Sequence, residues 1–246
     1  MNSISVVMPC YKGESVISHT LERTAKTLSK ITEDYEIILV VDGNLDKTFE
    51  IAQKIAEKNP RIRPFTYGKN LGKGYALQYG SQFITKDITA FIDSDLDLPP
   101  EQLKIFLRFI KARHADVVIG SKRHPLSKVK YPMVRRFLSW CYSAFLKIFF
   151  RLNVSDTQVG FKVMKSEVAK TVMPRIIVKR FAFDLEFLVV ANKFGFRIEE
   201  APVIVIFKNF PSNIDWKQIW HIFIDTLAIF YRLNITKYYD RRVDSK

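Results

Sequence analysis

Residues 88–100 read ITAFIDSDLDLPP, an apolar run that leads directly into three aspartates and two prolines. The run predicts a buried strand that ends at Asp93, because a short apolar stretch bounded by turn residues is typical of a strand covered on both faces. Pro99 and Pro100 predict the start of a helix, since proline is tolerated in the first helical turn. The stretch therefore predicts a strand, an acidic loop and a helix in succession.

The same alternation extends through the first half of the chain. Strands are predicted over 4–9, 35–42, 62–67, 88–93 and 116–121, and helices over about 15–30, 46–59, 72–84 and 99–113. Near-continuous apolar strands separated by helices predict an α/β fold, in which a mostly parallel sheet carries helices on both faces. Ligands bind outside the carboxyl ends of such strands. The polar segments that fall there are 9–14, 42–44, 93–97 and 120–123.

Composition limits the class of protein. The chain has 246 residues, of which 48% are hydrophobic, and this size favours one large core. Cys10 and Cys141 are too few for a disulfide framework, and the four histidines show no zinc-binding spacing. The first residues lack the basic and apolar regions of a secretory signal. The formal net charge of +14 indicates an anionic partner: nucleic acid, an anionic membrane surface or a phosphorylated substrate.

Two apolar segments distinguish the second half of the chain. Residues 137–150 read FLSWCYSAFLKIFF and predict a helix of about 21 Å, shorter than the ~30 Å hydrocarbon core of a membrane. Residues 216–233 predict a second apolar helix that charged residues interrupt. Aromatic residues and basic surroundings favour amphipathic helices that lie in a membrane interface. The alternative interpretation is that both helices belong to the core.

The acidic loop predicts a site for a cation. In an extended segment residues i, i+2 and i+4 point the same way, so Asp93, Asp95 and Asp97 are expected to converge. Their mutual repulsion would cost stability unless a cation lies among them. Oxygen ligands without His or Cys suit Mg²⁺ or Mn²⁺. The alternative interpretation is a solvated acidic loop.

The order of motifs resembles family-2 glycosyltransferases of the nucleotide-diphospho-sugar (GT-A) fold. Asp42 follows the second strand in VVDGNLDKT, KNLGKGYAL opens the third helix at 69–77, and Asp93-Ser94-Asp95 matches the D-x-D motif that holds a divalent metal on the donor diphosphate. The resemblance implies that Asp42 recognises the nucleoside base, and that Asp93 and Asp95, with Asp97 approaching, bind the metal. The donor-binding residues that it implies are Pro9, Tyr11, Glu14, Asp42, Asn70, Gly72, Lys73, Asp93, Ser94, Asp95 and Lys122.

A narrower resemblance is to polyprenyl-phosphate sugar transferases. Residues 120–123 are similar to their G-S-R segment, and residues 156–162 and 181–186 look most like dolichyl-phosphate β-glucosyltransferase, with dolichyl-phosphate mannose synthase as a near relative. This implies an inverting enzyme that moves a sugar, with glucose favoured, from a UDP-sugar to a dolichyl or polyprenyl phosphate. The chain departs from the family pattern at Lys12, at Val41 and at Lys122, where the family has Asn, Asp and Arg.

The prediction of acceptor-binding residues depends on the spacing of two residues and on the same resemblance. Arg135 and Ser139 stand at i and i+4 on one helix face and, with Arg123 and Gln158, are expected to hold the acceptor phosphate. A phosphate acceptor is ionised near neutral pH, its second pKa being about 6, and needs no strong base. Asp184 and Glu186 are then expected to orient the sugar or acceptor, and Asp93, Asp95, Asp184 and Glu186 form the predicted catalytic set. The alternative is that Asp184 is a helix-start carboxylate and Glu186 a surface residue.

The predicted organisation is a GT-A catalytic domain over 1–210, with an interfacial helix at about 132–151, followed by an amphipathic membrane-associating helix and basic tail over 211–246. The expected location is peripheral, at the cytoplasmic face of a membrane. Three alternatives stay open: a GDP-mannose-dependent mannose synthase, a transferase acting on a glycan hydroxyl, and a basic nucleic-acid- or membrane-binding protein. No P-loop and no G-x-G-x-x-G motif is present. A basic run before an aromatic helix suits lipid headgroups better than bases, so no nucleic-acid partner is expected.

Overall fold

The computed structural model describes residues 3–127, 143–180, 182–206 and 216–240. Its strands are β1 (Ile4–Cys10), β2 (Tyr35–Val41), β3 (Ile62–Thr66), β4 (Ile88–Phe91), β5 (Val117–Ser121), β6 (Lys162–Lys165) and β7 (Ile198–Pro202). Its α-helices are α1 (Ile17–Ser29), α2 (Thr48–Lys58), α3 (Lys73–Ser81), α4 (Leu103–Ala112), α6 (Ser166–Val172), α7 (Phe183–Lys193) and α8 (Trp216–Asn234). Short 3-10 helices are η1 (Pro100–Gln102), η2 (Met173–Arg175) and η3 (Tyr238–Asp240), and residues 143–150 form a further helical segment.

The strands form one seven-stranded sheet in the order β3-β2-β1-β4-β6-β5-β7. Neighbouring strands are parallel except around β6, which runs antiparallel to both β4 and β5. The prediction of a mostly parallel sheet is therefore confirmed. The chain first builds outward from β1 through β2 to β3, and then returns to the other side of β1 with β4. This reversal of direction between β1 and β4 is the kind of switch point at which open α/β sheets bind ligands.

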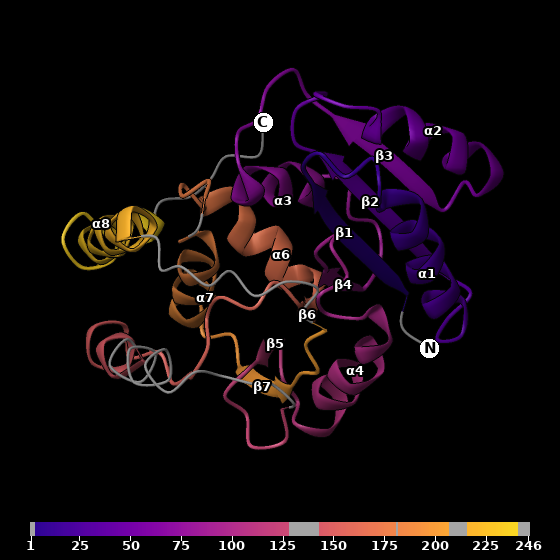
Figure 1. Cartoon of the computed structure of the whole chain (residues 1–246). Helices are drawn as coiled ribbons and strands as arrows, with labels where there is room; N and C mark the ends of the chain where they lie inside the picture. The colour runs from indigo at the N-terminus through magenta and orange to yellow at the C-terminus, as the bar shows by residue number, and fades with distance from the viewer. Residues whose placement is uncertain (1–2, 128–142, 181, 207–215, 241–246) are drawn as a thin grey trace.

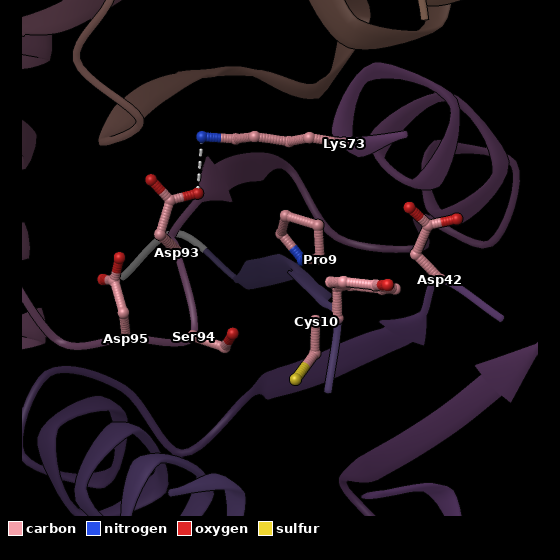
Figure 2. A pocket seen from close by; sticks show the side chains of 8 residues that line it. Pro9, Cys10, Asp42, Lys73, Asp93, Ser94 and Asp95 are labelled. Atoms are coloured by element: carbon pink, nitrogen blue, oxygen red, sulfur yellow. Dashed lines mark ion pairs between the residues drawn. The ribbon is translucent and has the colours of Figure 1, made fainter. Parts of the chain in front are cut away.

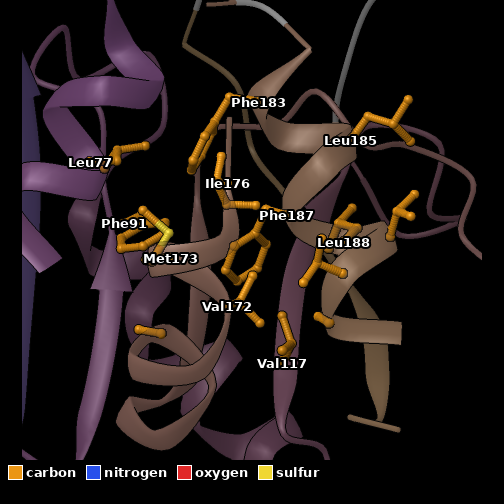
Figure 3. Packing of buried hydrophobic residues seen from close by; sticks show 14 of the residues in the cluster. Leu77, Phe91, Val117, Val172, Met173, Ile176, Phe183, Leu185, Phe187 and Leu188 are labelled. Atoms are coloured by element: carbon orange, nitrogen blue, oxygen red, sulfur yellow. The ribbon is translucent and has the colours of Figure 1, made fainter. Parts of the chain in front are cut away.

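Helices cover both faces of the sheet, as the apolar strand patterns predict (Figure 1). Successive side chains of a strand point to opposite faces, so Val6 and Val118 join one hydrophobic cluster while Val7 and Val117 join another. The first cluster is closed by α1, α2 and α4, and the second by α3, α6 and α7. Figure 3 shows part of the second cluster, in which Phe187 of α7 meets Phe91 of β4 at a ring-centroid distance of 5.9 Å.

The C-terminal helix α8 lies against this second cluster with one side only. Ile229 and Thr226 are buried, and Phe230 contacts Phe149 and Phe150 of the helical segment 143–150 at ring-centroid distances of 5.8 and 6.0 Å. The other side of α8 and the neighbouring segment expose large apolar residues, namely Ile148, Phe149, Trp220, Phe223, Ile224, Leu227 and Tyr231. Within the described ranges, no helix has the length and continuous apolar character needed to cross a lipid bilayer.

The helix predicted at about 132–151 falls partly on residues 128–142, which lie outside the described residues. Its last part, 143–150, is helical, and the helix predicted over 216–233 is observed as α8. Ile229 of α8 shares a hydrophobic cluster with the sheet, so the helix has a core-facing side as well as an exposed one. The division into units at residue 210 stays a prediction.

Candidate active site

A pocket opens at the carboxyl ends of β1, β2 and β4, where the sheet reverses direction. Its volume is about 250 Å³. Figure 2 shows carboxylates from the ends of β2 and β4 facing it, with a lysine from the start of α3. The lining residues are Pro9, Cys10, Tyr11, Asp42, Lys73, Asp93, Ser94 and Asp95. The structure therefore brings together seven of the predicted donor-site residues.

Asp42 fixes the loop that begins the motif KNLGKGYAL at residues 69–77. Its side chain is 3% exposed, and its carboxylate accepts hydrogen bonds from the backbone amides of Leu71 (2.7 Å) and Gly72 (2.9 Å) and from the hydroxyl of Tyr67 (2.9 Å). Burial, together with this carboxylate, raises the pKa of Tyr67, so its hydroxyl is a donor at neutral pH. Asp42 thus places the first residues of α3 at the rim of the pocket.

Lys73 supplies the cation that the acidic loop itself lacks. Its Nζ lies 2.6 Å from Oδ1 of Asp93, across the pocket from α3 (Figure 2). Burial of the Lys73 ammonium group lowers its pKa. The nearby carboxylates of Asp93 and Asp184 together have the larger, opposite effect, so the pKa of Lys73 is raised overall. Gly160 makes the arrangement possible, because a Cβ at this position would lie 1.9 Å from Oδ2 of Asp93 and 2.8 Å from Nζ of Lys73.

The acidic loop does not have the extended shape that the sequence predicts. Strand β4 ends at Phe91, two residues before Asp93, and residues 94–95 form a turn. Leu96 then adopts a φ of 61° and buries its side chain, leaving it 4% exposed. This left-handed residue rotates the chain, so the prediction that three carboxylates converge is wrong. Among the described residues, no three Asp, Glu, His or Cys side chains gather into a metal-binding group.

Two carboxylates of the acidic loop, Asp93 and Asp95, remain at the pocket, and they suit a divalent cation that arrives with a phosphate. Asp93 and Asp95 line the pocket, whereas Asp97 does not. The backbone amide of Asp97 donates a hydrogen bond to Oδ1 of Asp95 at 3.0 Å, which holds the Asp95 side chain in the loop. Mg²⁺ and related hard cations are commonly bound by one or two carboxylates, with water and substrate phosphates completing the shell. Asp93 and Asp95 fit that pattern.

The predicted catalytic carboxylates at the start of α7 have different environments. Asp184 is 7% exposed and pairs with the buried ammonium group of Lys162, which also donates to the carbonyl of Val159 at 2.6 Å. Asp184 is close enough to Lys73 to raise that residue's pKa. Glu186 is fully buried and does not line the pocket, so the alternative that it is a surface residue is wrong.

A second pocket, of about 400 Å³, lies beside the helical segment 143–150. The Arg123 guanidinium is held there by the hydroxyl of Ser143 and, at 3.3 Å, by the carbonyl of Ser155. Glu200 of β7 accepts hydrogen bonds from the amide and hydroxyl of Ser155 at 2.9 and 2.8 Å. The lining residues are Arg123, Ser143, Ala144, Lys147, Asn153, Val154, Ser155 and Glu200.

Several predicted residues lie outside both pockets. Glu14 is exposed and accepts a hydrogen bond from the amide of Lys47 at 3.1 Å. The amides of Lys122 and Gln158 both donate to Asp156, at 3.1 Å each, and partial burial raises the pKa of that carboxyl. Asn70 and Gly72 belong to the motif that Asp42 supports, but neither lines the pocket. Arg135 and Ser139 lie outside the described residues.

Sequence reasoning missed several residues of the two pockets and of the ion pair at α7, among them Cys10, Lys162 and Glu200. Cys10 lines the first pocket from the end of β1, and burial raises the pKa of its thiol. Lys162 is a lysine inside the apolar pattern GFKVM, and this placement is itself a signal of a buried ion pair. Glu200 lies within β7, whose sequence IEEAP is too short and too polar to stand out as a strand. Its contact with Ser155 joins residues 45 positions apart, which local patterns do not reveal.

Comparison with known proteins identifies a family for the chain. A family model described as "Glycosyl transferase family 2" matches residues 5–173. The chain is 30% identical over 202 residues to glycosyltransferase AglD of Haloferax volcanii, covering 81% of this chain and 32% of that protein. It is 30% identical over 208 residues to dolichyl-phosphate beta-glucosyltransferase ALG5C of Trichomonas vaginalis, covering 80% of this chain and 62% of that protein. The chain thus spans less than two thirds of either relative.

Solved structures share the fold at lower sequence identity. Mannosyl-3-phosphoglycerate synthase from Rubrobacter xylanophilus has a TM-score of 0.69 at 15% identity, over 98% of this chain and 77% of that one. Glucosyl-3-phosphoglycerate synthase from Mycobacterium tuberculosis, crystallised with UDP, has a TM-score of 0.66 at 17% identity, over 99% of this chain and 82% of that one. Both likenesses extend over nearly the whole described chain. By its family match and its fold, this chain belongs to glycosyl transferase family 2.

Proposed function

We propose that the chain is an inverting glycosyltransferase that moves a sugar from a nucleotide diphosphate to a dolichyl or polyprenyl phosphate, with UDP-glucose as the favoured donor. The observation that carries the proposal is the pocket at the sheet's switch point, where Asp42, Lys73, Asp93 and Asp95 meet. Relatives named as dolichyl-phosphate beta-glucosyltransferases support the acceptor class. A fold neighbour crystallised with Mn²⁺ and UDP-glucose supports the donor class.

The pocket has groups that can bind the nucleobase of the donor and others that can bind its diphosphate. Asp42 stands at the end of β2, with spare acceptor capacity on its carboxylate for the N–H of a nucleobase. Asp93 and Asp95 would hold Mg²⁺ or Mn²⁺, which when bound supplies positive charge to the diphosphate leaving group. Lys73 lies against Asp93 and can donate to a phosphate oxygen from the same position. These groups stabilise the negative charge that develops as the bond between the sugar and the diphosphate breaks.

No residue needs to remove a proton from a phosphate acceptor, because the acceptor is already ionised. Asp184 is already engaged in an ion pair with the ammonium group of Lys162, so its carboxylate is not free to serve as a base. Its position near Lys73 suits it to orient the sugar instead. A hydroxyl acceptor, in contrast, would need a general base to remove its proton.

The second pocket suits the acceptor phosphate. Arg123 and Lys147 place two positive charges there, and Ser143 adds a hydroxyl. Charge-assisted hydrogen bonds to a partly desolvated phosphate contribute about 1.5–3 kcal/mol each. Arg123→Ala is therefore expected to raise the KM for polyprenyl phosphate about ten- to a hundredfold, with the KM for the nucleotide sugar within about twofold of the wild type. Initial-rate kinetics with each substrate varied in turn measure both constants, and equal rises in the two would contradict this assignment.

The exposed apolar side of α8 suits a membrane surface. Trp220, Phe223 and Leu227 are 62%, 44% and 44% exposed, and each can insert into a lipid interface. With the chain's net charge of +14, this favours peripheral binding to anionic lipid at the cytoplasmic face.

Replacing all three of these residues by Ser is expected to lower the affinity for anionic vesicles at least about a hundredfold, because each buried apolar side chain contributes roughly 1.5–3 kcal/mol. Vesicle co-sedimentation measures this. The matched control is Leu45→Ser, which removes a residue 55% exposed in the loop between β2 and α2, outside α8. Equal effects of the two variants would show that α8 is not the lipid-binding surface.

The proposed function is tested by incubating the protein with polyprenyl phosphate, Mn²⁺ and a panel of nucleotide sugars, followed by mass analysis of the lipid product. The expected product is a hexosyl phosphoryl polyprenol from UDP-glucose. Mannose transfer from GDP-mannose would select the mannose synthase alternative. Salt-sensitive DNA binding without transfer from any donor would select the nucleic-acid-binding alternative and overturn the proposal.

A further inference from the structure

Glu186 occupies a position in the interior that the transfer chemistry does not use. It is 0% exposed, although it carries a carboxylate. Oε2 accepts hydrogen bonds from the backbone amides of Ile177 (2.9 Å) and Val178 (2.7 Å). Oε1 accepts from the guanidinium of Arg232 at 3.1 Å and from the hydroxyl of Tyr239. A buried carboxylate is tolerated only when it is paired and hydrogen-bonded, and here the partners come from two separate parts of the chain.

The first of these parts is the loop 176–180, which packs on the start of α3. The carbonyl of Lys179 accepts a hydrogen bond from the amide of Gly74 at 2.9 Å. The approach is close, because a Cβ at Gly72 would lie 2.5 Å from that carbonyl oxygen. Gly72 has a φ of 98°, a conformation that favours glycine, and its amide is bound by Asp42. The loop therefore holds the segment 72–74, which carries Lys73 into the pocket.

The second part is the C-terminal segment. Arg232 lies on α8 and Tyr239 on η3, and the Arg232 side chain also donates to the Tyr239 hydroxyl at 3.1 Å. On α8 the residues that face the protein are Thr226, Ile229 and Arg232, whereas Trp220 and Leu227, on the opposite side of the helix, are exposed. Lipid contact and docking onto the protein thus use different sides of one helix, so both can occur together.

We propose that Glu186 is a positioning residue: it couples docking of α8 to the shape of the donor pocket. The connection runs from Arg232 through Glu186 to the amides of 177 and 178, and from Lys179 to Gly74 beside Lys73. When α8 is docked, Arg232 and Tyr239 neutralise and hold Glu186, and Glu186 holds the loop against α3. A lipid surface that orders α8 favours the docked state, and so favours nucleotide sugar binding. The effect on nucleotide sugar binding rests on the proposed function. The coupling between docking of α8 and the loop 176–180 does not.

Amide hydrogen exchange of the full-length chain tests the coupling without any substrate. Arg232→Met removes the positive charge that faces the Glu186 carboxylate. It is expected to speed amide exchange at Ile177, Val178 and Gly74 about tenfold or more. Arg232→Lys keeps a charge there and should restore most of the protection. The matched control is Arg197→Gln, which breaks the exposed ion pair with Glu199 and should change none of these amides. Vesicles of phosphatidylglycerol should slow exchange at Gly74 in the wild type but not in Arg232→Met.

Faster exchange in α8 alone, with 70–80 and 176–180 unchanged in Arg232→Met, would overturn the proposal. If Arg232→Met does not fold, Tyr239→Phe removes a single hydroxyl from Glu186 and should show the same pattern at smaller amplitude. In kinetics, Arg232→Met should raise the KM for nucleotide sugar about tenfold and leave kcat within about twofold, with rescue by Lys. The exchange pattern without any transferase activity would refute the proposed function and leave the coupling standing.

Discussion

Replacing Asp95 by Asn is expected to lower kcat/KM for sugar transfer about a thousandfold, which corresponds to roughly 4 kcal/mol of transition-state stabilisation. Asp95 is one of the two carboxylates that the acidic loop contributes to the pocket, and the amide of Asn has the same shape without the negative charge. The fold should be retained, because removing one charge next to Asp93 relieves repulsion within the loop. Steady-state kinetics together with thermal unfolding separate the loss of activity from any loss of structure.

The matched control is Asp97→Asn, which changes the third carboxylate of the same loop. Asp97 does not line the pocket, so its replacement should lower kcat/KM less than about tenfold. A loss equal to that of Asp95→Asn would show that the loop rearranges on metal binding to the three-carboxylate shape that the sequence predicts. Full activity of Asp95→Asn would remove the basis for placing the metal in this loop.

Replacing Lys162 by Met is expected to lower the free energy of unfolding by about 3–5 kcal/mol, because it leaves the buried carboxylate of Asp184 without its partner. The Lys162 side chain is 1% exposed and that of Asp184 is 10% exposed, so water does not replace the lost contact. Equilibrium unfolding in urea measures the change. An effect below about 1 kcal/mol would show that solvent reaches Asp184 and that the ion pair contributes little.

The double variant Lys162→Met, Asp184→Leu distinguishes a structural role of the pair from a role in transfer. Removing both charges should recover most of the lost stability, since two apolar groups of similar volume replace a buried ion pair at little cost. Transfer should stay at least about a hundredfold below wild type if Asp184 orients the sugar. Recovery of both stability and activity would show that Asp184 only serves the fold.

The part of the site built from strand ends could be predicted from the sequence. Asp42 and Asp93 each follow a near-continuous apolar run, and the runs predict neighbouring strands of one parallel sheet. The carboxyl ends of such strands meet at one edge, so the pocket between them follows from pattern alone. This part of the pocket was predictable because Asp42 and Asp93 follow the strands directly in sequence.

The contacts that neutralise and support these residues were not predictable in the same way. The sequence predicts an extended acidic loop, but Leu96 adopts a left-handed conformation and buries its side chain, which turns the loop. The pairs Lys73–Asp93 and Lys162–Asp184 join residues about 20 positions apart, and no periodic pattern encodes them. Strand β6 has only four residues and inserts antiparallel between two parallel partners, which a short apolar stretch does not reveal. Glu186 is predicted to orient the sugar or the acceptor, whereas its side chain is fully buried and does not line the pocket.

The central claim is that this pocket delivers a sugar from a metal-bound nucleotide diphosphate to a lipid phosphate. It is tested most directly by measuring transfer of labelled glucose from UDP-glucose to polyprenyl phosphate, with free polyprenol as the matched acceptor and with the metal present or chelated. The account predicts labelled lipid from polyprenyl phosphate alone, only with the metal present. Equal labelling of polyprenol, or full transfer in excess chelator, would contradict it.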